Sequence, residues 1–152
     1  PKLNQSIFEK SQKSSKLNLN PNIKLFSKPT NNVISKILNL AKSNSERHEI
    51  LESYLLSCDR DTIATEVPVY FYDKVFGSIS GHIDILQVKD GKIHILDYKP
   101  EAKSENKESV TTQLNLYALA LSFRTKIPLN NFICTYFDQY NSFQFKPRYR
   151  IN

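Results

Sequence analysis

The chain has 152 residues, enough for one domain that buries most of its apolar surface without disulfides or a structural metal. Hydrophobic residues make up 39% and charged residues 24%, no apolar run approaches 18 residues and no signal-peptide pattern is present, so we expect an intracellular protein, cytoplasmic or nucleoid-associated, rather than a membrane protein. The net charge of +6 and the pI near 9.3 favour a polyanionic partner, although many basic proteins bind no nucleic acid.

The N-terminal third of the chain predicts an arm followed by two helices. Residues 1–30 are rich in Ser, Asn and Lys and cannot form a core, so we expect an arm or irregular cover there and a folded domain over residues 31–152. Apolar residues recur at helical spacing from Val33 to Ala41. A second helical stretch carries His48 and Leu51, with Ser43 or Ser45 as its N-cap.

The rest of the chain predicts five strands and one helix. Strands are expected at about 66–73, 76–88, 92–99, 132–137 and 142–146, and a helix at about 108–124. A three-stranded antiparallel start followed by a crossing helix and further strands indicates an α/β or α+β sheet with helices packed on it. Cys58 and Cys134 are too few for a four-thiolate metal site, and we interpret both as free thiols.

The segment "GHIDILQVKDGKIHILDYKP" at residues 81–100 predicts a tight hairpin. Asp90 and Gly91 lie between two alternating apolar runs, and this pair favours a type I′ turn, which needs positive φ at both central positions. The register that follows places Lys89 opposite Lys92 and His94 opposite Gln87. It also places Asp84 directly opposite Asp97.

Two opposed carboxylates repel each other, and a divalent cation removes the repulsion. Directly opposed side chains lie about 5 Å apart at Cβ, so like charges there destabilise the sheet. Lys99 returns to the face of Asp97 after two residues, which places Asp84, Asp97 and Lys99 around one point. A second interpretation stays open, in which one Asp is solvated at a strand end and the other pairs with Lys99.

Three motifs occur in order: "GHID" at 81–84, "LDYK" at 96–99 and "QLNLY" at 113–117. Together they resemble the PD-(D/E)XK nuclease superfamily, and specifically its RecB-like branch, which carries Gly-x-x-Asp, Asp/Glu-x-Lys and then Gln-x-x-x-Tyr on the following helix. The resemblance covers roughly residues 46–145. It implies an α/β restriction-endonuclease-like core with a central mixed β-sheet flanked by helices.

The resemblance also implies a metal site. Mg²⁺ or Mn²⁺ would be held by His48, Asp84, Asp97 and the backbone carbonyl of Tyr98, and Lys99 would orient or help deprotonate a metal-bound water. Carboxylate and carbonyl oxygens suit a hard cation. Without the motifs, His48 would be interpreted as a buried core histidine. Glu52 shares the helix face of His48, but most helical glutamates are solvated.

Other residues are assigned to the substrate. Gln113 and Tyr117 are one helical turn apart, and the resemblance places them near the active site, although Tyr117 packed in the core is the alternative. His82, Lys146 and Arg148 are candidates for substrate phosphate, with Tyr149 as a base-stacking residue.

The function that this pattern predicts is a divalent-metal-dependent deoxyribonuclease that hydrolyses phosphodiester bonds. The alternative is a catalytically silent DNA-binding or scaffolding module with the same fold. The expected partner is DNA, with targeting supplied by another protein or domain, and the sequence gives no oligomeric state.

Overall fold

The computed structural model of the chain describes residues 23–74 and 77–149. Residues 1–22 of the expected N-terminal arm therefore lie outside the described residues. The remaining part of that range contains a strand, β1 (Phe26–Pro29), which pairs antiparallel with the last strand of the sheet. Sequence interpretation included these four residues in the arm, whereas they form an edge of the sheet.

Two helices follow β1, as the apolar spacing predicted. Helix α2 spans Asn32–Asn39, and the side chain of its N-cap, Asn31, accepts a hydrogen bond from Val33 N. Helix α3 spans Asn44–Cys58. Its N-cap is Ser43, whose hydroxyl accepts from Glu46 N, so the first of the two predicted caps is used.

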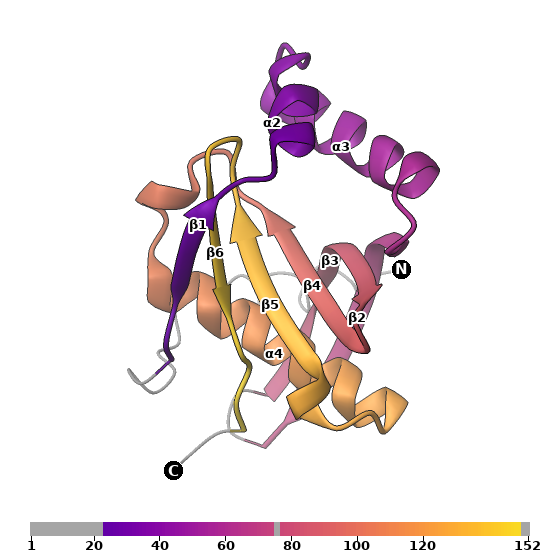
Figure 1. Cartoon of the computed structure of the whole chain (residues 1–152). Coiled ribbons are helices and arrows are strands. Elements are labelled where there is room, and N and C mark those ends of the chain that lie inside the picture. The colour runs from indigo at the N-terminus through magenta and orange to yellow at the C-terminus, as the bar shows by residue number, and fades with distance from the viewer. Residues whose placement is uncertain (1–22, 75–76, 150–152) are drawn as a thin grey trace, which may run out of the picture.

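A six-stranded mixed sheet forms the centre of the fold (Figure 1). Besides β1 it contains β2 (Thr62–Asp73), β3 (Gly77–Lys89), β4 (Lys92–Tyr98), β5 (Phe132–Phe137) and β6 (Asn141–Phe145). The strand order is β1-β6-β5-β4-β3-β2, and only the β4–β5 pair is parallel. This architecture confirms the α/β core with a central mixed sheet flanked by helices.

Helix α4 (Lys107–Thr125) makes the crossover between the parallel strands β4 and β5. Figure 1 shows it lying across one face of the sheet, with α2 and α3 beyond one end. Short 3₁₀ turns at Ala102–Ser104 and Leu129–Asn131 precede and follow it. Most residues of α4 from Val110 to Ala120 are buried, on every side of the helix, so this middle part is enclosed rather than amphipathic.

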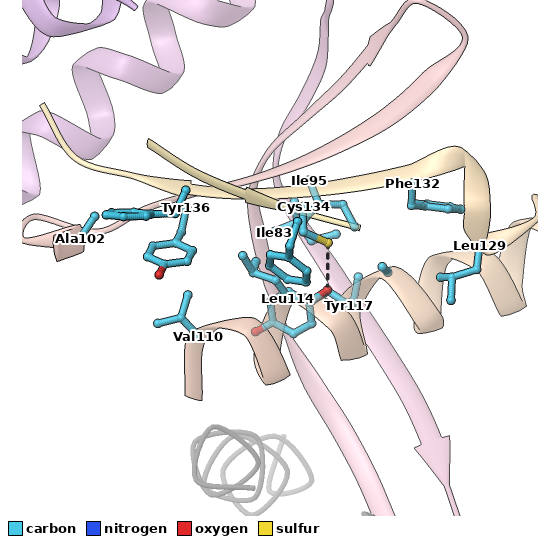
Figure 2. Packing of buried hydrophobic residues seen from close by; sticks show 14 residues of the cluster. Ile83, Ile95, Ala102, Val110, Leu114, Tyr117, Leu129, Phe132, Cys134 and Tyr136 are labelled. Carbon is cyan, nitrogen blue, oxygen red and sulfur yellow. Dashed lines mark hydrogen bonds between the residues drawn. The ribbon is translucent and has the colours of Figure 1, made fainter. Parts of the chain in front are cut away.

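Two buried clusters hold these layers together. The larger lies between α4 and the sheet and includes Ile83, Ile95, Leu114 and Cys134, whose thiol donates to Leu114 O (Figure 2). The smaller lies under α3 and is made by Leu38, Leu51, Leu55, Ile85, Tyr98 and Phe137. Cys134 is buried and Cys58 exposed, and both are free thiols, as expected.

The β3–β4 hairpin has the predicted turn and register. Asp90 and Gly91 have φ of 52° and 72°, the two positive values that a type I′ turn requires. Lys89 pairs with Lys92 and Gln87 with His94. The ladder ends at the pair Ile85–Leu96, one position before Asp84 and Asp97.

None of the described helices is long and apolar enough to cross a membrane.

Candidate active site

The candidate site lies where β3 and β4 stop pairing. Beyond Ile85–Leu96, the Asp84 carboxylate takes the place of a backbone acceptor: its Oδ2 accepts a hydrogen bond from Tyr98 N at 3.0 Å. The Asp97 carboxyl is nevertheless close enough to the Asp84 carboxyl to act on it electrostatically. The sequence thus predicted the proximity of the two acids correctly.

This arrangement changes the pKa of Asp84. Burial and the neighbouring Asp97 carboxyl raise the pKa of Asp84 to about 8, against the opposing effect of the Tyr98 N–H. Burial disfavours the charged form of this carboxyl group, and the Asp97 carboxylate adds repulsion. A cation bound here would relieve that repulsion.

Lys99 neutralises part of the charge. Its Nζ lies 3.0 Å from Asp97 Oδ2. The exposed fraction of Asp97, taken over the whole residue, is only 8%. Burial lowers the pKa of Lys99, but the ion pair with Asp97 and the nearby Asp84 raise it more, so the net shift is upward. Lys99 is therefore a protonated, anchored cation in the protein itself.

Helix α3 places His48 beside Asp84. His48 Nδ1 lies 3.8 Å from Asp84 Oδ2, too far for a hydrogen bond, and its ring meets the edge of Tyr98 at a centroid distance of 4.9 Å. Burial lowers the pKa of His48 despite the nearby acids, which favours the neutral imidazole. Neutral imidazole is the form that binds metal ions.

Glu52 also belongs to this cluster, which sequence interpretation missed. Ligand atoms of His48, Glu52 and Asp84 all lie within 4.8 Å of one another. Among the residues that the structure describes, Glu52 Oε1 is buried and accepts no hydrogen bond. The available signal was its position four residues after His48 on one helix face.

Glu66 on β2 completes the acidic surroundings. Burial, together with the nearby Glu66 carboxylate, raises the pKa of Glu52 to about 8. The backbone of Glu66 has a φ of 50°, uncommon for a residue with a Cβ, at the position opposite Asp84 in the β2–β3 register. This local bend costs about 1–3 kcal/mol and directs an acidic residue toward the cluster.

Tyr117 and Gly81 connect the helix motif to the hairpin motif. Gln113 Nε2 donates to the Tyr117 hydroxyl at 3.1 Å, so these residues act as a pair. A Cβ built on Gly81 would lie 2.7 Å from Tyr117 Cζ and closer still to its hydroxyl. Glycine at position 81 therefore leaves the space that the tyrosine occupies.

The Tyr117 hydroxyl stays protonated at neutral pH. Burial and the negative charge of Asp97 raise the pKa of Tyr117 to about 12. Tyr117 belongs to the core cluster as well (Figure 2), which is the position that the sequence offered as the alternative. Its ring packs in the core while its hydroxyl is influenced by both site carboxylates.

The other predicted residues lie on β3, on β4 and after β6. His82 is exposed on β3 and pairs with Pro68 of β2, and Lys146 and Arg148 are exposed after β6. His94 pairs with Gln87 near the far end of the hairpin. The Tyr98 carbonyl remains a predicted ligand, while the Tyr98 N–H holds Asp84.

Comparison with known families agrees with this geometry. The sequence matches the model of the PD-(D/E)XK nuclease superfamily over residues 13–147. The chain belongs to this superfamily. Comparison with curated proteins gave no match. In this PD-(D/E)XK chain, Asp84, Asp97 and Lys99 lie close together.

The donor set fits a divalent metal. The acidic groups supply hard oxygen ligands, the neutral His48 adds a nitrogen, and Glu52 offers a buried oxygen without a protein partner. A metal-binding site at His48, Glu52 and Asp84 is therefore plausible from both the family and the geometry.

Proposed function

We propose that this protein is a RecB-like nuclease that hydrolyses phosphodiester bonds of DNA with Mg²⁺ or Mn²⁺. The observation that carries the proposal is the convergence of His48, Glu52 and Asp84 beside the Asp97–Lys99 ion pair. The combination of Gly-x-x-Asp, Asp-x-Lys and Gln-x-x-x-Tyr supports the RecB-like branch.

The protein would hold the cation with His48, Asp84, Asp97 and the backbone carbonyl of Tyr98, as the resemblance implies, and with Glu52 as an additional ligand. A bound divalent ion polarises a phosphate oxygen and acidifies a water molecule. The imidazole among the ligands favours Mn²⁺ more than an all-oxygen site would.

Each protein group has a task that follows from its position. Lys99, fixed by Asp97, presents its ammonium to a water molecule or to the negative charge that develops on the phosphate. Tyr117, held by Gln113, offers a neutral hydroxyl as a hydrogen-bond donor. Because both are tethered before substrate arrives, little reorganisation is needed during the reaction.

The basic character of the chain supports a nucleic-acid substrate. The net charge is +6 even though the site itself is acidic, so the excess cations lie elsewhere. Exposed Lys146 and Arg148, and His82 on β3, the strand of Asp84, are the candidates for phosphate contact.

The test is a cleavage assay on linear and circular DNA, single- and double-stranded, with Mg²⁺ or Mn²⁺. Asp97→Ala and Lys99→Ala are each expected to lower the rate at least 100-fold, while Lys103→Ala, an exposed lysine nearby in sequence, serves as the matched control. Cleavage of circles identifies endonuclease action.

Metal-dependent cleavage that survives both substitutions would remove the proposed site. Tight DNA binding without cleavage in either metal would instead identify the silent DNA-binding module. An RNA substrate of the same sequence, tested in parallel, decides between deoxyribonuclease and ribonuclease activity.

A further inference from the structure

A pocket bordered by exposed aromatic rings lies at the C-terminal end of α4. Its volume is about 520 Å³, and its walls include Phe71 of β2, Leu119 and Phe123 of α4, and Tyr149. Phe123 and Tyr149 are 64% and 65% exposed, and Phe71 meets Phe123 edge to face at 5.9 Å. Large rings gathered at one exposed place are typical of binding surfaces rather than of an ordinary solvated face.

A buried asparagine fixes the segment that carries Tyr149. Asn115 on α4 is only 1% exposed, and its side chain makes two hydrogen bonds to one residue of that segment. Its Nδ2 donates to Arg148 O at 2.9 Å, and its Oδ1 accepts from Arg148 N at 2.7 Å. The clamp holds the chain beside the pocket, so the Tyr149 ring is presented at low entropic cost.

Cations accompany these rings. Lys126 Nζ lies 4.6 Å from the centre of the Phe123 ring. Arg124 is exposed and follows Tyr117 by seven residues, which places it two turns further along the same side of α4. Rings that can stack with bases, next to cations that can bind phosphate, form a combination suited to nucleic-acid strands.

The pocket is bordered by α4 and β2, the two elements that also carry Tyr117 and Glu66 beside the metal cluster. Phe123 follows Tyr117 by six residues of helix, about 9 Å along the axis. Phe71 follows Glu66 by five residues of strand, about 17 Å. At about 3.4 Å per stacked nucleotide, these lengths correspond to roughly three to five nucleotides.

We propose that this pocket binds unpaired bases of a single-stranded nucleic acid, with Phe123 and Tyr149 stacking on bases and Arg124 and Lys126 contacting phosphates. Only an unpaired strand exposes base faces to such rings, whereas a duplex presents mainly its phosphates. As an account of substrate choice, the inference rests on the proposed nuclease function, but the binding itself needs neither metal nor cleavage.

The experiment measures fluorescence anisotropy of a labelled 12-residue oligothymidylate and of an abasic strand with the same number of phosphates, in EDTA. Phe123→Ala and Tyr149→Ala are each expected to weaken oligothymidylate binding about tenfold and to leave abasic-strand binding unchanged. Tyr140→Ala, which removes a 69% exposed ring from the β5–β6 turn, is the matched control. Thermal melting verifies that each variant is folded. If Phe123→Ala is destabilised, Tyr149→Ala still tests the proposal.

A second arm tests the cations. Arg124→Gln and Lys126→Gln should each reduce the slope of log K against log salt by about 0.7, the value for one lost phosphate contact on a single strand. Equal losses on the thymidylate and abasic strands, or no loss with Tyr149→Ala, would overturn the proposal, as would stronger binding to a duplex of the same length.

Failure of this inference and failure of the proposed function can be separated. If Asp97→Ala abolishes cleavage while the aromatic variants bind oligothymidylate normally, only the stacking pocket is wrong. If the wild-type protein cleaves nothing but the aromatic variants lose thymidylate binding, only the nuclease proposal is wrong.

Discussion

Substitution of Gly81 by alanine should disturb the candidate site without replacing any ionisable residue. Gly81 does not have a positive φ, so the backbone accepts alanine, but the added Cβ would lie 2.7 Å from Tyr117 Cζ and 3.0 Å from Cε1. The Tyr117 ring is buried and packed in the core, so it cannot swing away freely.

Overpacking of this kind costs about 1–3 kcal/mol. For a chain of this size, each 1 kcal/mol lowers Tm by about 2–4 °C, so Gly81→Ala should melt roughly 2–12 °C below the wild type. Displacement of the Tyr117 hydroxyl from Gln113 should also lower the cleavage rate, by about tenfold. Ser80→Ala, at the preceding residue of β3, is the control, because it changes a small side chain on the same strand.

A double-mutant cycle with Tyr117→Phe tests the physical reason. Removal of the hydroxyl eliminates the closest overlap but keeps Cζ, so Gly81→Ala should cost less in the Tyr117→Phe background, with a coupling of at least about 0.5 kcal/mol. Denaturant unfolding measures it. An unchanged Tm for Gly81→Ala, or the same loss in both backgrounds, would refute the contact as the cause.

Three further predictions concern the metal cluster and the sheet. Mn²⁺ should raise the Tm of the wild type, and Glu52→Gln should reduce that rise. Glu49→Gln, which changes an exposed neighbour, should leave the rise unchanged. Equal Tm shifts in all three proteins would contradict Glu52 as a ligand. The raised pKa values of Asp84 and Glu52, both about 8, favour their protonated forms in the folded protein. The stability of the metal-free protein should therefore fall as pH rises from about 4 to 8, and stabilisation by Mn²⁺ should grow over the upper part of that range. Melting curves from pH 5 to 9 check both expectations, and a Tm that does not change with pH refutes the pKa shifts. Buried Asp138 accepts main-chain hydrogen bonds from Ala102, Tyr140 and Asn141, so Asp138→Ala should lower the free energy of unfolding by about 3 kcal/mol in a denaturant titration, and a loss below about 1 kcal/mol would show that the turn relaxes.

Local signals in the sequence were sufficient for the hairpin. The Asp90–Gly91 pair has few conformational options, and its two-residue loop fixes every facing pair up to Asp84 and Asp97. The helix of His48 was equally predictable, because its N-cap and the apolar residues after it are local signals. The helix of Gln113 was predicted to within one residue at each end.

Features that depend on tertiary contacts were not predictable in the same way. Glu52 has the same local pattern as a solvated helical glutamate, and only the docking of α3 on the sheet buries its Oε1. The left-handed bend at Glu66 has no glycine or asparagine to signal it. Strand β1 is short, exposed and ends in Pro29, so it lacks the alternation by which strands are recognised.

The modest size of the cluster beneath α3 has a dynamic consequence. Six buried side chains attach this helix to the sheet, and only Leu51 and Leu55 come from α3 itself. Detachment of the helix should therefore require less free energy than global unfolding, and its amides should exchange with solvent deuterium earlier than those of β4 and β5. His48 and Glu52 belong to α3, whereas Asp84 belongs to the sheet. A cation bound by all three residues would therefore hold the helix on the sheet and slow this exchange.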